Sequence, residues 1–255
     1  MKTSPRRFCI LASAFCLLTS FACAPTRPVI DLSKLGPQEL MDLGMKQLDT
    51  KQYGKATTTF QQVTYDYATT RYAMEAQFYL AETYLLKKEY AQAQLEFEFL
   101  VSNYPSSPFA EEARYKTAQS YLRAVPMMAL DQSGLKKAQD MVDLFMEQYP
   151  QSKFLNEIEM IEADIAARYA RKEYDAALLY AKSGEYASAR IYLEHILQAY
   201  PRASLIPDVK LQLAIACDET GDKSKARQGY EEVIASAPDP KVRKLAADRL
   251  ARMKN

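Results

Sequence analysis

The sequence is poor in the residues that build metal sites and disulfides. It has no tryptophan, a single histidine (His195) and four cysteines, of which only Cys217 lies beyond residue 23. One cysteine can form neither an internal disulfide nor a structural zinc site, and one histidine cannot build a histidine-rich metal site. We therefore expect a protein that needs no metal and no other cofactor.

Glycine is also scarce, and neither sign of charge is in excess. With 33 basic and 32 acidic residues the formal net charge is +1, which gives no reason to expect a nucleic-acid partner. The seven glycines form no phosphate-binding loop, and the chain carries no Cys-x-x-Cys pair and no nucleophile motif. Good helix formers dominate instead. We expect a non-enzymatic, all-helical protein with short loops.

The N-terminus has the pattern of a secretion signal. Basic residues at positions 2–7 precede an uncharged, mostly apolar run, Phe8 to Phe21. This run is shorter than the roughly 20 residues of a membrane-spanning helix. A basic start followed by a short apolar run is typical of a signal peptide, which we assign to residues 1–22.

Cys23 follows the small residue Ala22 at the end of this run. The arrangement resembles a bacterial lipoprotein signal, in which the cysteine becomes the lipidated N-terminus. This resemblance implies lipidation at Cys23 and a tether over residues 23–36. Because Ala24 stands where aspartate favours the inner membrane, it also implies the outer membrane. A plain secretory signal with an incidental cysteine is the alternative.

The rest of the chain is organised by an internal repeat. In four segments an alanine is followed twelve positions later by a proline: Ala93/Pro105, Ala138/Pro150, Ala189/Pro201 and Ala226/Pro238. A fifth copy starts at Ala56, with Ala68 in place of the proline. A large residue stands four positions after each alanine: Phe60, Phe97, Val142, Leu193 and Tyr230. A small residue lets two helices approach closely, and the large residue one turn later fills the gap beside it.

This pattern resembles the tetratricopeptide repeat, a helix pair of about 34 residues. The resemblance implies an all-α superhelix of about five helix pairs plus a C-terminal capping helix. We expect repeats 1–3 over residues 37–153, with an insertion at 123–133 where Pro126 breaks the helix. Residues 154–255 would hold a long linking helix, repeats 4 and 5, and the cap.

The lipoprotein-like signal, the five repeats, the Tyr-Pro-x-Ser turns at Tyr104–Ser107 and Tyr149–Ser152, and the long helix together resemble the BamD family. These are lipoprotein subunits of the outer-membrane β-barrel assembly machine. The resemblance implies a scaffold on the periplasmic face of the outer membrane. Its implied partners are the barrel-forming subunit, other lipoproteins of the complex, and unfolded outer-membrane protein clients.

Two sets of residues are candidates for binding. By repeat register, the first helices should line a concave peptide groove with Met41, Met45, Leu48, Glu75, Phe78, Glu82, Glu112, Tyr115 and Gln119. Methionine and aromatic side chains adapt to varied apolar partners, although some of these side chains could instead fill the core. The C-terminal cations Lys241, Arg243, Lys244, Arg249 and Arg252 are candidates for an acidic partner surface, or form a solvated cap.

Two other functions stay open. A periplasmic adaptor of the Tol-Pal type would share the repeats, but such proteins usually carry a coiled coil, and no sustained heptad appears here. An enzyme whose catalytic residues follow no known motif is the second alternative. Robust activity of the purified protein, abolished by a point mutation, would reveal it.

Overall fold

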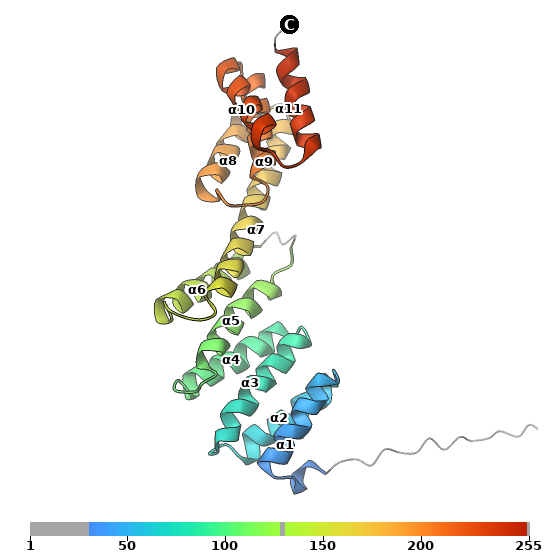
Figure 1. The fold of residues 1–255 in the computed structure, drawn as a ribbon, viewed down its shortest axis with the longest axis vertical. Helices are drawn as coiled ribbons and strands as arrows, with labels where there is room; N and C mark the ends of the chain where they lie inside the picture. Colours follow the sequence, from blue (N-terminus) through green and yellow to red (C-terminus); the bar gives the residue numbers. More distant parts are fainter. Residues whose placement is uncertain (1–30, 128–130, 254–255) are drawn as a thin grey trace, which may run out of the picture.

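The structure, a computed structural model, describes residues 31–127 and 131–253, and most of these residues are helical (Figure 1). A short 3-10 helix, η1 (Leu32–Lys34), precedes the first α-helix. The α-helices of the described residues are α1 (Pro37–Asp49), α2 (Tyr53–Asp66), α3 (Arg71–Leu86), α4 (Tyr90–Asn103), α5 (Ala110–Ala124), α6 (Ser133–Gln148), α7 (Leu155–Lys182), α8 (Tyr186–Ala199), α9 (Ile206–Glu219), α10 (Lys223–Ser236) and α11 (Pro240–Arg252). None of these helices combines the length and the apolar character that a membrane span requires.

Each helix packs against the helices that precede and follow it in sequence. The result is an elongated solenoid with α1 at one end and α11 at the other (Figure 1). Five helix pairs, from α1–α2 to α9–α10, are followed by α11. The expected all-α superhelix of about five pairs and a capping helix is thereby confirmed.

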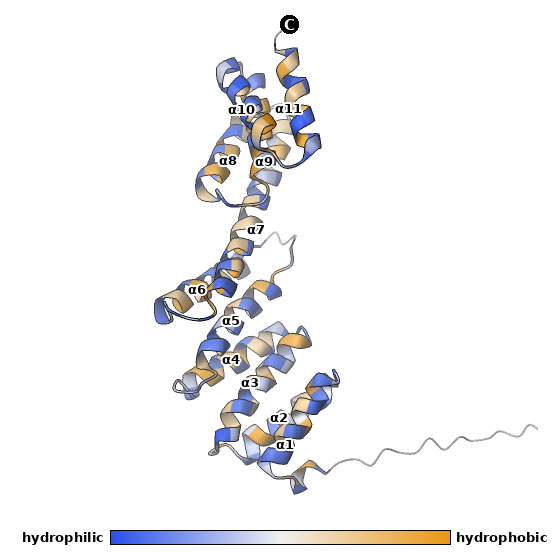
Figure 2. Cartoon of the chain, in the orientation of Figure 1, coloured by the Kyte–Doolittle hydropathy of each residue, from blue (hydrophilic) through white to orange (hydrophobic). Residues whose placement is uncertain are grey.

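The repeated alanines lie in the core between packed helices. All five, from Ala56 to Ala226, are fully buried. The large residues four positions later are also at most 1% exposed. In the first pair the helices also pack tightly at Gly44, where an added methyl group would lie 2.5 Å from the Phe60 ring. Figure 2 shows hydrophobic and hydrophilic residues mixed along the helices, as in helices that bury only part of their surface.

The helices end where the repeat pattern predicts. The second helices α4, α6 and α8 stop at Asn103, Gln148 and Ala199, two positions before a proline. Proline cannot donate the backbone hydrogen bond that would continue the helix. In the first repeat α2 also ends, at Asp66, although Ala68 replaces the proline. There the Tyr67 hydroxyl donates to the Leu35 carbonyl at 2.9 Å and so ties the turn to the start of α1.

The long helix α7 is the first helix of the fourth pair and also packs on the third pair. Its N-terminal half packs on α5 and α6 through Ile158, Ile161 and Ile165, and its C-terminal half packs on α8. Between these halves Arg168, whose side chain is only 12% exposed, donates to the carbonyls of Leu122 and Val125. These carbonyls lie at the end of α5, where the Leu122 carbonyl also accepts from the Val125 N–H at 3.2 Å and Arg168 supplies the donor to the Val125 carbonyl. Arg168 therefore holds α7 to the end of α5.

Candidate functional site

The row of residues expected to line a peptide groove is divided by the structure. Met41 and Phe78 are only 3% and 5% exposed. Met41 packs in the cluster shared by α1, α2 and α3, and Phe78 stacks on Phe109 with ring centroids 5.0 Å apart. The prediction that these two side chains are groove contacts was wrong, because they face the neighbouring repeat and hold successive repeats together.

The other apolar and amide members of the row are half-buried. Met45 and Leu48 lie at the margin of the α1 cluster. On α5 the Tyr115 ring stacks on Phe154 at 5.3 Å, and the Gln119 amide donates to the Tyr115 hydroxyl at 2.9 Å. This leaves part of each side chain at the surface, where it can contact another molecule.

The three carboxylates of the row gather around one tyrosine. Burial raises the pKa of Tyr79 on α3, and the nearby charges of Glu75, Glu112 and Glu82 raise it further. Glu82 is partly neutralised, since Lys116 lies 3.1 Å from its Oε1. We call Glu75, Glu82 and Glu112 the acidic row. It places three carboxylates close together on the first helices of repeats 2 and 3.

Beside Glu75 lies a depression of about 400 Å³, at the starts of α1 and α3 and just before α5. Tyr72, Met74 and Phe109 form an apolar lining, and the Tyr72 hydroxyl donates to the Gln38 side chain at 2.9 Å. Because Arg71 lines the depression beside Glu75, its charges are balanced, and its aromatic walls can accept an apolar side chain of a bound peptide.

A second aromatic surface, on α2 and α4, was not predicted from the sequence. Tyr65 is 85% and Phe99 49% exposed, and with Tyr104 they line a depression of about 550 Å³. A signal was available, because Phe97 and Phe99 are two positions apart and cannot both face the core of one helix. Phe97 occupies the repeat position, so Phe99 had to point outward.

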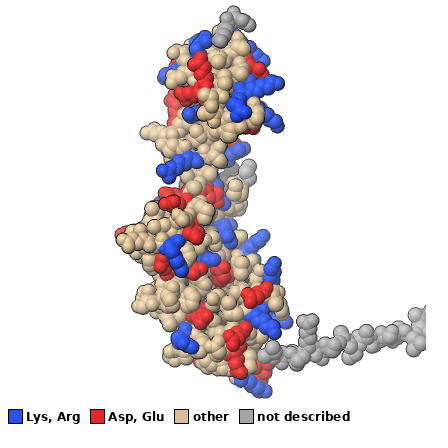
Figure 3. Space-filling view, viewed as in Figure 1, with Lys and Arg blue, Asp and Glu red and all other residues tan. Residues whose placement is uncertain are grey.

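The five C-terminal cations have different roles. Arg243 donates to the Ala237 and Pro238 carbonyls at 2.6 and 2.9 Å and so caps the end of α10. Arg249 pairs with Glu219 of α9 at 3.0 Å. Lys241, Lys244 and Arg252 are exposed and form no side-chain ion pair with the described residues. Figure 3 shows basic side chains gathered at the end formed by α10 and α11. Of the five, these three cations are the ones available to a partner.

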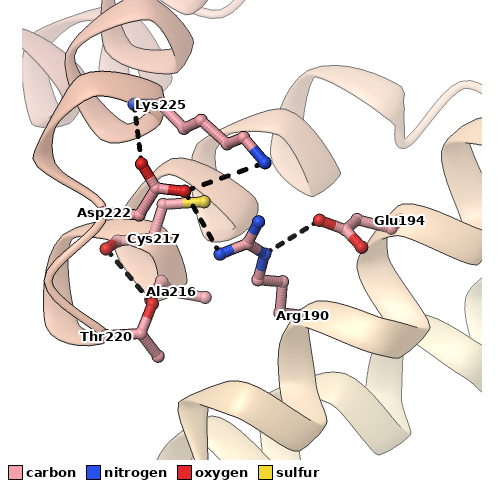
Figure 4. Close-up of polar contacts among 7 residues, drawn as sticks. All are labelled: Arg190, Glu194, Ala216, Cys217, Thr220, Asp222 and Lys225. Carbon is pink, nitrogen blue, oxygen red and sulfur yellow. Dashed lines mark hydrogen bonds and ion pairs between the residues drawn. The ribbon is translucent and has the colours of Figure 1, made fainter.

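Cys217, the one cysteine among the described residues, lies beside ion pairs that join the last two repeats. Arg190 of α8 bridges Glu194 at 2.8 Å and Asp222 at 3.5 Å, next to the Cys217 thiol (Figure 4). Burial raises the pKa of this thiol, which keeps it protonated and a poor nucleophile. Arg190 thus joins the fourth repeat to the fifth.

Other polar groups give no sign of a metal centre. His195 contacts the Glu173 carboxylate at 2.6 Å on the surface of α7 and α8. Within residues 31–127 and 131–253, no cluster of His, Cys, Asp and Glu is placed to hold a metal ion. Cys23, the expected lipidation site, lies outside the described residues.

Two family models match the chain. A model of an outer membrane lipoprotein family, YfiO, matches residues 34–189, and a tetratricopeptide repeat model matches residues 180–248. Neither describes an enzyme domain. No curated protein gives a significant match.

Solved structures with similar folds are distant. A thermophilic TPR protein of Thermus thermophilus is 19% identical with a TM-score of 0.37, covering 85% of this chain and 100% of that one. The TPR2AB domain of yeast Sti1, in a complex with pHSP90, is 12% identical with a TM-score of 0.48, covering 79% and 78%. A tetratricopeptide repeat protein from Parabacteroides merdae is 15% identical with a TM-score of 0.42, covering 84% and 85%. At such scores these likenesses add nothing to the helix order and packing described above.

Proposed function

The chain belongs to the YfiO, or BamD, family of outer membrane lipoproteins, and from this premise we propose that it is a non-enzymatic scaffold of the β-barrel assembly complex. The family match over residues 34–189 carries the proposal. It is supported by a solenoid that offers separate surfaces on its first and last helices. Stacked repeats of this kind build extended binding surfaces.

The proposal includes a lipid anchor at Cys23. The basic start, the short apolar run and the small residue before Cys23 all favour it. Two or more acyl chains bury enough methylene groups for stable attachment to a membrane. The protein would then face the periplasm from the inner leaflet of the outer membrane. Mass spectrometry of the mature N-terminus tests this, and an unmodified terminus elsewhere than Cys23 contradicts it.

We assign client binding to the first three repeats. The acidic row, with Tyr115, Gln119 and the margin formed by Met45 and Leu48, fits an extended segment that carries aromatic and basic side chains. Apolar contacts would contribute about 25 cal/mol per Å² of buried surface before ordering costs. Because an unfolded client loses conformational freedom on binding, we expect modest affinity.

We assign partner binding to α11. Lys241, Lys244 and Arg252, which form no ion pair with the described residues, fit an acidic surface on the periplasmic part of the barrel-forming subunit. Charges at the margin of an interface act mainly on the rate and salt dependence of association. Other lipoproteins of the complex would join through the same assembly.

A pull-down from detergent-solubilised membranes tests the function as a whole. The tagged full-length chain should capture the barrel-forming subunit, identified by mass spectrometry. The variant Lys241→Glu, Lys244→Glu, Arg252→Glu should capture less of it, with an unchanged circular dichroism spectrum. Absence of the barrel-forming subunit from the wild-type eluate would refute the assignment to this complex.

A further inference from the structure

A basic depression of about 620 Å³ lies at the turns between α1 and α2 and between α3 and α4. Its lining includes Lys51, Lys55, Lys87, Lys88, Tyr53 and Leu86, and no carboxylate among the described residues lines it. We call the four lysines the lysine edge. We propose that the lysine edge binds the phosphate groups of an anionic phospholipid surface. The choice of a lipid rests on the lipid anchor proposed above.

Most of the charge at this edge is free to bind a ligand. Lys87 pairs with Glu89 at 2.9 Å and lies 5.2 Å from the centre of the Tyr84 ring. Lys51, Lys55 and Lys88 are exposed and form no ion pair with any described residue. An ammonium group is a compact point charge that suits a phosphate oxygen.

The backbone of the two turns gives an independent indication. Lys51 and Lys88 adopt φ values of 57° and 65°, in the left-handed region. The matching turns of repeats 4 and 5 place Gly184 and Gly221 there, at 81° and 85°. A side chain makes this conformation unfavourable, whereas glycine adopts it freely. Since neither lysine side chain forms a hydrogen bond or ion pair within the described chain, folding alone gives no advantage to lysine here.

An apolar side chain among the lysines favours a membrane over a soluble phosphate or an acidic peptide. Leu86 is 43% exposed within the same depression. A leucine surrounded by cations suits the boundary between lipid headgroups and acyl chains, where both kinds of side chain find partners.

The anchor is close enough for both contacts to form together. Residues 23–31 can span up to about 28 Å, at about 3.5 Å per residue, before the 3-10 helix η1 (Leu32–Lys34) begins. The helix α1, which separates this tether from the lysine edge, is about 20 Å long at 1.5 Å per residue. The lysine edge can therefore reach the membrane that holds Cys23, and its contact would orient the first repeats against that surface.

Vesicle co-sedimentation tests the proposal without the anchor. The protein is the chain from residue 23 with Cys23→Ser, and the vesicles contain phosphatidylethanolamine with either phosphatidylglycerol or phosphatidylcholine. We expect binding to the phosphatidylglycerol vesicles alone, weakened by salt. The variant Lys51→Glu, Lys55→Glu, Lys88→Glu should bind at least tenfold more weakly. The control Lys182→Glu, Arg202→Glu, Arg227→Glu changes the charge equally in repeats 4 and 5 and should keep binding.

Equal loss in both variants would overturn the proposal, because net charge alone would then explain binding. A protein that binds millimolar inorganic phosphate or an acidic peptide but does not bind the vesicles would also overturn it. The variant Lys51→Gly, Lys88→Gly separates ligand binding from folding: its melting temperature should stay or rise, while vesicle binding falls. Unchanged vesicle binding by this variant and the triple variant would also overturn the proposal. The anchor itself is tested separately, by the mass of the mature N-terminus.

Discussion

The first two repeats and the last two form the same turn with different residues. Before α8 and α10 the left-handed position holds glycine, Gly184 and Gly221. Before α2 and α4 it holds Lys51 and Lys88, at a cost of roughly 1 kcal/mol each. The surroundings differ in part: the turn of the fifth repeat pairs Lys223 with Asp218 and Lys225 with Asp222, whereas at the lysine edge only Lys87 is paired among the described residues, with Glu89.

The cores of the two regions do not share this difference. Ala93 and Ala189 are both fully buried, and Phe97 and Leu193 fill the space one turn later in the same way. The comparison shows that packing follows the repeat in both regions, while the turn chemistry varies independently of it. Turn residues are therefore where the two regions can differ in function.

Core substitutions should cause the largest loss of stability, and they test whether the two regions are packed in the same way. Phe97→Ala and Leu193→Ala should each destabilise the protein by about 2–5 kcal/mol, because each leaves a cavity beside a buried alanine. Urea unfolding measures the loss. Phe99→Ala, at a 49% exposed position, is the matched control and should change little. A large effect in only one region would show that the cores are not equivalent.

A smaller loss of stability is expected where α7 contacts the end of α5. Arg168→Ala should cost about 1–3 kcal/mol, because the Val125 carbonyl loses its donor, while the Leu122 carbonyl keeps the Val125 N–H. Arg171→Ala removes an exposed pair with Asp175 on the same helix and should cost less than about 1 kcal/mol. Thermal melts of the two variants should differ. If they coincide, Arg168 does not hold α7 to α5.

The smallest effect addresses the turns directly. Gly184→Lys and Gly221→Lys should each destabilise by about 1 kcal/mol, whereas Lys51→Gly and Lys88→Gly should be neutral or stabilising by less than about 1 kcal/mol. Denaturation midpoints of the four single variants provide the measurement. Lysine tolerated at all four positions would remove the distinction between the two sets of turns.

Much of this fold follows from local chemistry that the sequence displays. The spacing from Ala93 to Pro105 predicts a helix with a close contact and an end, and α4 has both. The positions of Met41 and Phe78 were misjudged for a different reason. The repeat register places a residue on a face of a helix, but its exposure to solvent depends on the next repeat. For Phe78 the covering residue is Phe109.

The contacts of the C-terminal cations could not be predicted from the sequence either. A run of basic residues does not reveal that Arg243 caps α10 or that Arg249 reaches Glu219. Both contacts depend on the angle at which α11 returns to its neighbours. Likewise, nothing near Arg168 in sequence marks the α5 carbonyls as its acceptors. Long side chains that bind distant backbone are hard to predict from patterns.

We propose that the first repeats bind clients while the last helix binds the barrel-forming subunit. Site-specific photo-cross-linking in the bacterial envelope tests it most directly, with the photoreactive residue at position 75 in one chain and at position 244 in another. We predict cross-links from position 75 to unfolded outer-membrane proteins and from position 244 to the barrel-forming subunit. Cross-links from both positions to the same molecule, or the reverse assignment, would contradict the account.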